Sequence, residues 1–227
     1  MSLWDFSAVK HFVVAFAFLG VLLGAITMGG PGEYADTMRA ERALLLPVPD
    51  GYCALSKQDG DGGRLFKKSR FEPEAAQVQA ITYFAECDQL SRWRKEQLPI
   101  DRFGVYSAVR GEFAGADVSR QDFVAAMAEY LSDRDVPSLE EGLAMVHSGV
   151  SVADLGLVHQ DADAAYTAML LSGPEAKGEI QVHLTAYTKS NEFQYVLHLS
   201  APFVDETTIR DLVATQKLSI KRILRES

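Results

Sequence analysis

The sequence predicts an α+β fold, in which helices cover a mainly antiparallel sheet, behind one N-terminal transmembrane helix. Three observations predict it: strand-like segments follow one another late in the chain, capped helical segments stand before and after them, and residues 12–30 carry no charge. These observations divide the chain into a cytoplasmic n-region (1–11), a transmembrane signal-anchor (12–30), a juxtamembrane linker (31–45) and an exported α+β domain (46–227).

The apolar run FVVAFAFLGVLLGAITMGG at residues 12–30 would form a helix about 28 Å long. That length is close to the roughly 30 Å hydrocarbon core of a bilayer. A cleaved signal peptide would end in a small-x-small site, which residues 27–29 match poorly. In a bacterial setting we therefore expect a single-pass inner-membrane protein with most of its chain in the periplasm. A secreted periplasmic protein, released by signal cleavage, is the alternative.

The chain has two cysteines, Cys53 and Cys87, and both lie in the predicted exported domain. An oxidising compartment favours a disulfide between such a pair. The loop-entropy relation gives this bridge about 3 to 4 kcal/mol of stabilisation. Two free buried thiols are the alternative.

The first half of the domain alternates between strands and helices. A Pro-Asp-Gly turn at residues 49–51 ends a stretch of extended chain. β-branched and aromatic residues predict strands at 76–87 and 102–110. Between these strands, residues 88–98 are predicted to form a short helix with Asp88 as its N-cap.

Capping residues locate the later helices, and strands follow them. Ser119 with Asp122, and then Ser138 with Glu141, have the spacing that starts a helix. Residues 151–159 and 163–173 are predicted strands, and 179–201 form a hairpin. A last helix begins after Asp205, and its apolar residues recur with the helical period: Ile209, Leu212, Val213, Ile220, Ile223 and Leu224.

This meander of strands ends in the proline-containing corner SAPF and continues into a C-terminal amphipathic helix. In that order of elements the chain resembles the sandwich of PsbP-like and Mog1-like proteins. The resemblance extends over residues 46–227 and depends on element order alone. It therefore implies a fold and no function.

The hairpin contains two histidines, His183 and His198, one on each strand. A turn centred on Ser190 and Asn191 would place the two directly opposite each other. Alternation assigns the core face to seven residues: Val182, Leu184, Ala186, Phe193, Tyr195, Leu197 and Leu199. The histidines fall on the other face, together with Thr185, Tyr187 and Gln194.

Two uses of this second face are predicted. Tyr187, Thr185 and Gln194 form a candidate interaction surface. Directly opposed histidines could share a divalent metal, although zinc requires at least three protein ligands. His159 is the candidate third ligand, because it stands near a turn in the segment HQDAD. No other cofactor is predicted.

The net charge and the catalytic motifs that the sequence lacks narrow the possible classes of function. A net charge of −9 argues against nucleic-acid binding. The sequence contains no nucleophile elbow, zinc-protease motif, C-x-x-C or phosphate loop. We therefore expect a non-enzymatic accessory or assembly subunit of an inner-membrane protein complex, which contacts the bilayer through residues 12–30. The alternatives are a periplasmic ligand- or metal-binding module that uses the 179–201 hairpin, and an exported hydrolase built around Tyr187, His183, His198 and His159.

Overall fold

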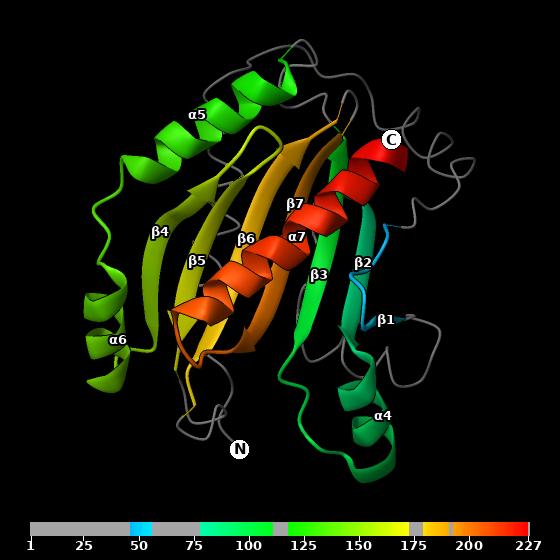
Figure 1. The fold of residues 1–227 in the computed structure, drawn as a ribbon, viewed down its shortest axis with the longest axis vertical. Helices are drawn as coiled ribbons and strands as arrows, with labels where there is room; N and C mark the ends of the chain where they lie inside the picture. The colour runs from blue at the N-terminus through cyan, green and yellow to red at the C-terminus, as the bar shows by residue number, and fades with distance from the viewer. Residues whose placement is uncertain (1–45, 56–77, 111–117, 173–178, 191–192, 227) are drawn as a thin grey trace, which may run out of the picture.

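The computed structural model describes residues 46–55, 78–110, 118–172, 179–190 and 193–226. These residues form one seven-stranded antiparallel sheet with the strand order β1-β2-β3-β7-β6-β5-β4 (Figure 1). The strands are β1 (Tyr52–Leu55), β2 (Val78–Glu86), β3 (Phe103–Arg110), β4 (Val152–Gln160), β5 (Ala165–Leu171), β6 (Gln181–Lys189) and β7 (Phe193–Pro202). The predicted α+β class, an antiparallel sheet with helices, is confirmed for this part of the chain.

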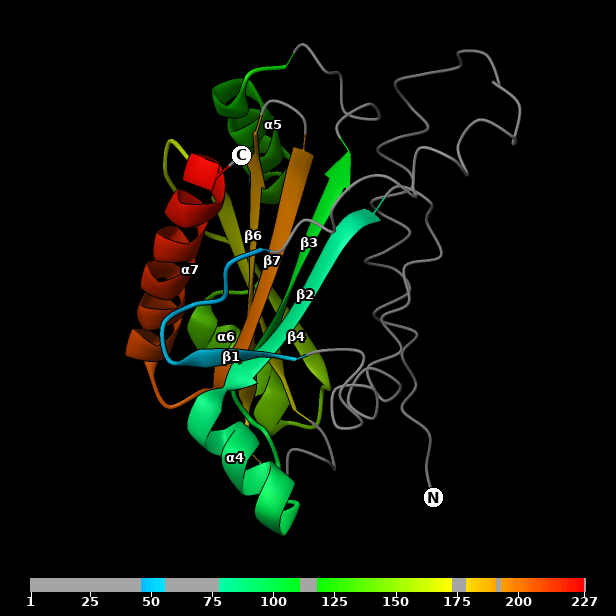
Figure 2. The ribbon, with the colours of Figure 1, turned by 90° about the vertical axis from the view of Figure 1, so that its right-hand side faces the viewer.

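Four helices accompany the sheet in the described residues: α4 (Cys87–Glu96), α5 (Arg120–Ser132), α6 (Leu139–His147) and α7 (Glu206–Glu226). The long α7 lies along one side of the sheet, and α4 extends from its lower end (Figure 2). Residues of α6 and α7 pack in the same apolar cluster, so these two helices cover one face. Residues of α5 pack against Tyr187 and Val196, which alternate along their strands with the residues facing α7. Helix α5 therefore covers part of the other face of the sheet.

Capping residues start the helices largely where the sequence predicts. The Ser119 hydroxyl accepts the Asp122 N–H at the start of α5, and Ser138 with Glu141 forms a complete capping box at α6. The Asp205 carboxylate accepts the Thr207 N–H before α7. The prediction of Asp88 as an N-cap is wrong, because β2 continues directly into α4 and Glu86 holds the cap position. Asp88 instead lies in the first turn, where its charge favours the helix dipole.

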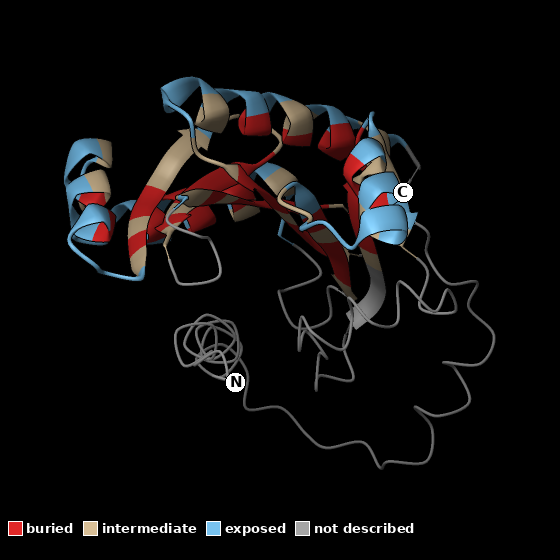
Figure 3. Cartoon of the chain, turned by 90° about the horizontal axis from the view of Figure 1, so that it is seen from below, coloured by how far each residue is buried: buried red, intermediate tan, exposed pale blue. Residues whose placement is uncertain are grey.

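The apolar core lies between the sheet and α6 with α7. Leu184, Ala186, Leu197 and Leu199 are at most 1 % exposed, which confirms the predicted core face of the hairpin. Viewed from below, buried residues line the sheet and the inner sides of the helices, while the outer helix surfaces are exposed (Figure 3).

One polar side chain, Gln216 of α7, lies completely buried in this core. Its amide Nε2 donates to two sheet carbonyls, Leu184 O at 3.2 Å and Leu197 O at 2.8 Å. Gln216 therefore ties α7 to the backbones of β6 and β7.

The predicted register of the hairpin is wrong by two residues. His183 pairs with Ser200, and His198 pairs with Thr185, because Lys189 is already paired with Gln194. The turn is thus centred one residue further along the chain than Ser190-Asn191. A shift of two leaves every side chain on its predicted face, since the side-chain period of a strand is also two.

The predicted disulfide between Cys53 and Cys87 is present. It joins β1 to the first residue of α4, across 34 residues of sequence. The Cys87 N–H also donates to Gly51 O at 3.0 Å, so a backbone hydrogen bond supports the same junction.

The predicted n-region, signal-anchor and linker, residues 1–45, lie outside the described residues. Among the helices that the structure describes, none is both long enough and apolar enough to span a bilayer.

Candidate functional site

The face of the sheet opposite α7 carries both histidines in two neighbouring rows of paired residues. One row runs across four strands as Met169, His183, Ser200 and Phe103. The next row runs as Thr167, Thr185, His198 and Val105. We call these eight residues the histidine face. It adjoins the cluster under α5, which begins one row further along with Ala165, Tyr187 and Val196.

A polar contact and a ring contact position the two histidines on this face. Thr185 Oγ1 lies 2.8 Å from His198 Nδ1, which is hydrogen-bond distance. The ring of Phe103, which is 42 % exposed, meets the His183 ring edge-on with centroids 6.1 Å apart. The Ser200 hydroxyl, between them in the row, is buried and has no hydrogen-bond partner in the described part of the chain.

Burial makes both imidazoles neutral. It lowers the pKa of His183 to about 4, because a charged ring would lose its hydration there. Burial also lowers the pKa of His198 to about 4, and the nearby His183 contributes in the same direction. At neutral pH both imidazole rings are therefore uncharged.

The three residues of the predicted interaction surface are covered. Tyr187 is 3 % exposed and packs against Val124 and Met127 of α5, and burial raises the pKa of its hydroxyl. Thr185 and Gln194 are 1 % and 8 % exposed. Side chains buried this deeply offer no open surface for a partner, so this use of the face is not supported by their positions.

His159, the predicted third metal ligand, is on the opposite face of the sheet. Its ring lies 5.4 Å from that of Tyr166, whose side chain belongs to the core under α7. The structure therefore does not bring His159 to His183 and His198, and the three-histidine site is not formed. The two register shifts in β4, on either side of Leu157, cancel at His159, so alternation from the buried Ala153 places His159 on the core face beside Tyr166.

The hydrolase site built around Tyr187, His183, His198 and His159 is not formed for the same reason. Tyr187 lies beneath a helix and His159 lies on the other face. Within the described residues, no cluster of three or more histidine, cysteine, aspartate or glutamate side chains has the geometry of a metal site.

His159 instead lies beside an ion pair, Asp161 with Lys217, at the β4–β5 turn. Its Nε2 is 3.9 Å from Asp161 Oδ2, and Lys217 Nζ of α7 is 3.3 Å from the same oxygen. Burial alone would raise the pKa of Asp161. The backbone N–H groups of Asp163 and Ala164, together with Lys217, outweigh burial and lower that pKa. This ion pair links the turn to α7.

A second polar group, at the opposite end of the hairpin strands from SAPF, was not predicted. Lys189 is 1 % exposed, and its Nζ donates to Val118 O at 2.8 Å. Arg120 donates from Nε to Lys189 O and from Nη1 to Asp163 Oδ1, both at 2.9 Å. No local signal marks Lys189 as buried, because lysine is almost always exposed. These contacts join the start of α5 to the sheet.

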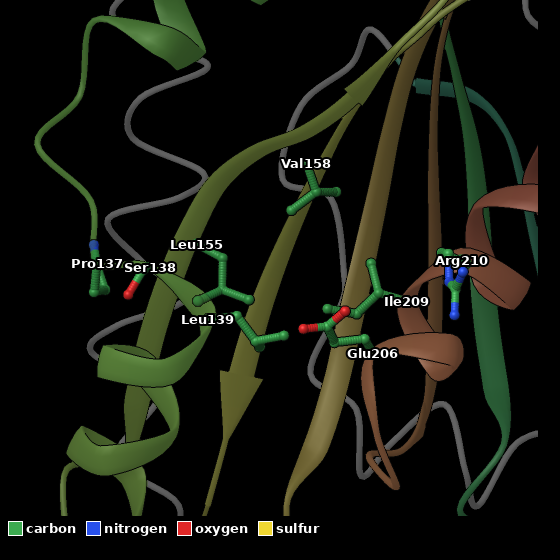
Figure 4. A pocket seen from close by; sticks show the side chains of 8 residues that line it. All are labelled: Pro137, Ser138, Leu139, Leu155, Val158, Glu206, Ile209 and Arg210. Atoms are coloured by element: carbon green, nitrogen blue, oxygen red, sulfur yellow. The ribbon is translucent and has the colours of Figure 1, made fainter.

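The surface of the described residues includes the following two hollows. The first encloses about 290 Å³ between the start of α6, β4 and the start of α7 (Figure 4). Leu139, Leu155, Val158 and Ile209 line it, and Glu206 and Arg210 stand on the α7 side. The second encloses about 360 Å³ beside Gln121, Val124 and Asp161. Small-molecule sites span roughly 300 to 1,000 Å³, so the first hollow, at about 290 Å³, is just below that range and the second, at about 360 Å³, is near its lower limit.

No family model matches the sequence, and a search of the curated proteins also finds no match. Among solved structures the chain is similar to the Ran-binding protein Mog1p of Saccharomyces cerevisiae. That similarity has 11 % identity and a TM-score of 0.33, and it covers 78 % of this chain and 85 % of Mog1p. A similarity this low transfers neither a fold nor a function. The fold assignment above is therefore based only on the strands and helices of this chain.

Proposed function

We propose that the chain is a membrane-anchored, periplasm-facing accessory or assembly subunit of an inner-membrane protein complex, without enzymatic activity of its own. The observation that carries the proposal is the uncharged run at residues 12–30, which is long enough to cross a bilayer once and precedes a separate domain. An uncleaved anchor would keep that domain within reach of other membrane proteins.

The disulfide supports an exported domain. Cys53 and Cys87 are bridged in the structure. Stable disulfides are typical of oxidising compartments such as the periplasm and are rare in the cytosol. The bridge therefore fits the orientation in which residues 46–227 lie outside the cytoplasm.

The surface of the described residues supports a binding role over catalysis. Neither hollow brings together a nucleophile, a base and an orienting group. In the first hollow, the Ser138 hydroxyl already serves the capping box of α6. Exposed apolar side chains stand on and beside α7 instead, with Val204 78 % and Leu218 59 % exposed.

The test is co-purification from native membranes. The full-length chain, expressed at its natural level with a small C-terminal tag, should be extracted in a mild detergent and resolved on a native gel. We expect it to migrate with a larger membrane complex, whose other subunits are identified by mass spectrometry.

A chain in which residues 12–30 are replaced by an unrelated transmembrane helix is the matched control. It keeps the domain at the membrane, so weaker co-purification would identify contacts made by the natural anchor. Retention of the partner would assign the contacts to the domain. Migration of the natural chain as a lone monomer would refute the proposal.

A further inference from the structure

We propose that Met169, His183 and His198 form a binding site for Cu(I). This site goes beyond the subunit role proposed above and would exist whether or not the chain joins a complex. It replaces His159 by a residue that the sequence pattern did not suggest, because Met169 becomes a neighbour of the histidines only through the register of β5 against β6.

The sheet places the three side chains on one face of three adjacent strands. Met169 of β5 is paired directly with His183 of β6. Directly opposite residues have Cβ atoms about 4.5 to 5.5 Å apart. His198 of β7 is paired with Thr185, which makes it a diagonal neighbour of His183. Diagonal neighbours are still within reach of long side chains. His183 therefore stands between a thioether and a second imidazole.

The donor set selects the metal. A thioether is a soft ligand that favours Cu(I), and imidazole nitrogens also bind copper. Zinc prefers thiolate, imidazole and carboxylate ligands and needs at least three of them. Among the strand partners of the two histidines in the described sheet, Thr185 and Ser200 are the residues with side-chain oxygen atoms, and both carry hydroxyls rather than carboxylates. The face is therefore suited to a soft ion and not to zinc.

Two hydroxyls are placed to orient the ligands. Thr185 Oγ1 lies 2.8 Å from His198 Nδ1 and can fix the orientation of that ring. Metal-binding histidines usually have their other nitrogen held by such a hydrogen bond. Ser200 Oγ is buried beside His183 and has no hydrogen-bond partner in the described residues. A His183 ring that gives one nitrogen to the metal can donate its other N–H to this hydroxyl.

The test is a Cu(I) titration of the full-length chain in detergent, under ascorbate and in competition with bicinchoninate. We expect one Cu(I) per chain and weaker binding of Zn(II). Met169→Leu keeps the side-chain volume and should weaken Cu(I) binding at least about tenfold. His183→Gln and His198→Gln should abolish binding at this site. X-ray absorption at the copper edge should show a sulfur ligand in the natural chain and none in Met169→Leu.

Two control variants separate this site from copper bound elsewhere. Met145→Leu alters a methionine of α6, and His159→Gln alters the histidine on the opposite face. Both should bind Cu(I) as the natural chain does. Near-UV circular dichroism checks that every variant is folded. The proposal is overturned if the natural chain binds less than about 0.1 Cu(I), if Zn(II) binds more tightly, or if Met169→Leu retains both affinity and the sulfur signal.

Discussion

Gly104 of β3 occupies a position in the sheet where no side chain can be accommodated. A Cβ built there would lie 2.3 Å from Phe84 Cζ and 2.5 Å from His198 O. The Phe84 ring covers the glycine and packs against Tyr106, with ring centroids 4.5 Å apart. The carbonyl belongs to the backbone of β7, which is paired with β3 along its length. Gly104→Ala therefore requires both a buried ring and a central strand to move.

Overpacking of this kind costs typically 1 to 3 kcal/mol. We expect the upper part of that range, about 3 kcal/mol, because one of the two clashing groups is backbone. For a chain of this size, 1 kcal/mol lowers the melting temperature by about 2 to 4 °C. The melting temperature of Gly104→Ala should consequently fall by about 6 to 12 °C, as measured by near-UV circular dichroism of the full-length chain in detergent.

Gly142 of α6 is the matched control, because it is a second buried glycine with a different obstacle. A Cβ there would meet Leu155 Cδ2 at 2.7 Å, which is the end of a flexible side chain, and Ala153 Cβ at 3.5 Å. Alanine also gains about 1 kcal/mol over glycine within a helix. Gly142→Ala should therefore melt within a few degrees of the natural chain. If Gly104→Ala melts like the natural chain, the contact between β3 and β7 described here is wrong.

Three further changes test other parts of the structure. Reduction of the disulfide, or Cys53→Ser with Cys87→Ser, should cost about 3 to 4 kcal/mol in urea unfolding, and an unchanged midpoint would mean that the bridge contributes nothing. Gln216→Glu would bury a carboxylate against two carbonyl oxygens and should lower the free energy of unfolding by several kcal/mol. Ala214→Glu, on the exposed side of α7, should lower it by less than about 0.5 kcal/mol, and equal effects would contradict the buried position of Gln216. His183 and His198 have folded pKa values of about 4, below their unfolded value of 6.5, so their contribution to stability is complete above pH 6.5 and is lost as the pH falls toward 4. The urea midpoint of the double variant His183→Gln with His198→Gln should therefore change less with pH over that range than the midpoint of the natural chain. An equally steep pH profile would assign the loss of stability to other groups.

Local signals in the sequence were sufficient for most of the elements. The capping serines Ser119 and Ser138 start helices because they satisfy backbone N–H groups within three residues. The core face of the hairpin follows from alternation, which does not depend on the partner strand. Leu212 and Ile220 show the apolar stripe of α7, and Gln216 lies in the same stripe at the helical period. Its burial could have been inferred from that position.

Pairing between strands depends on information that these local signals lack. The hairpin register shifted by two because the position of the turn, and not the strand pattern, determines which residues face each other. His159 was chosen as a third ligand for its place near a turn, and its position beside Tyr166 on the core face is fixed only when β4 pairs with β5. Met169 was overlooked because methionine in a strand normally indicates core packing, and its position opposite His183 is fixed only when β5 and β6 pair.

The two faces of the sheet differ in what a substitution would measure. Under α7 the side chains fill a closed core, so a change at Leu184 or Gln216 reports stability. On the histidine face, Met169 and His183 are only partly buried and no described helix packs over them. Met169→Leu should therefore alter metal affinity with little change in melting temperature, whereas Gln216→Glu should lower the melting temperature in the absence of any metal. A loss of both properties in Met169→Leu would instead place Met169 in the structural core and remove it from the proposed copper site.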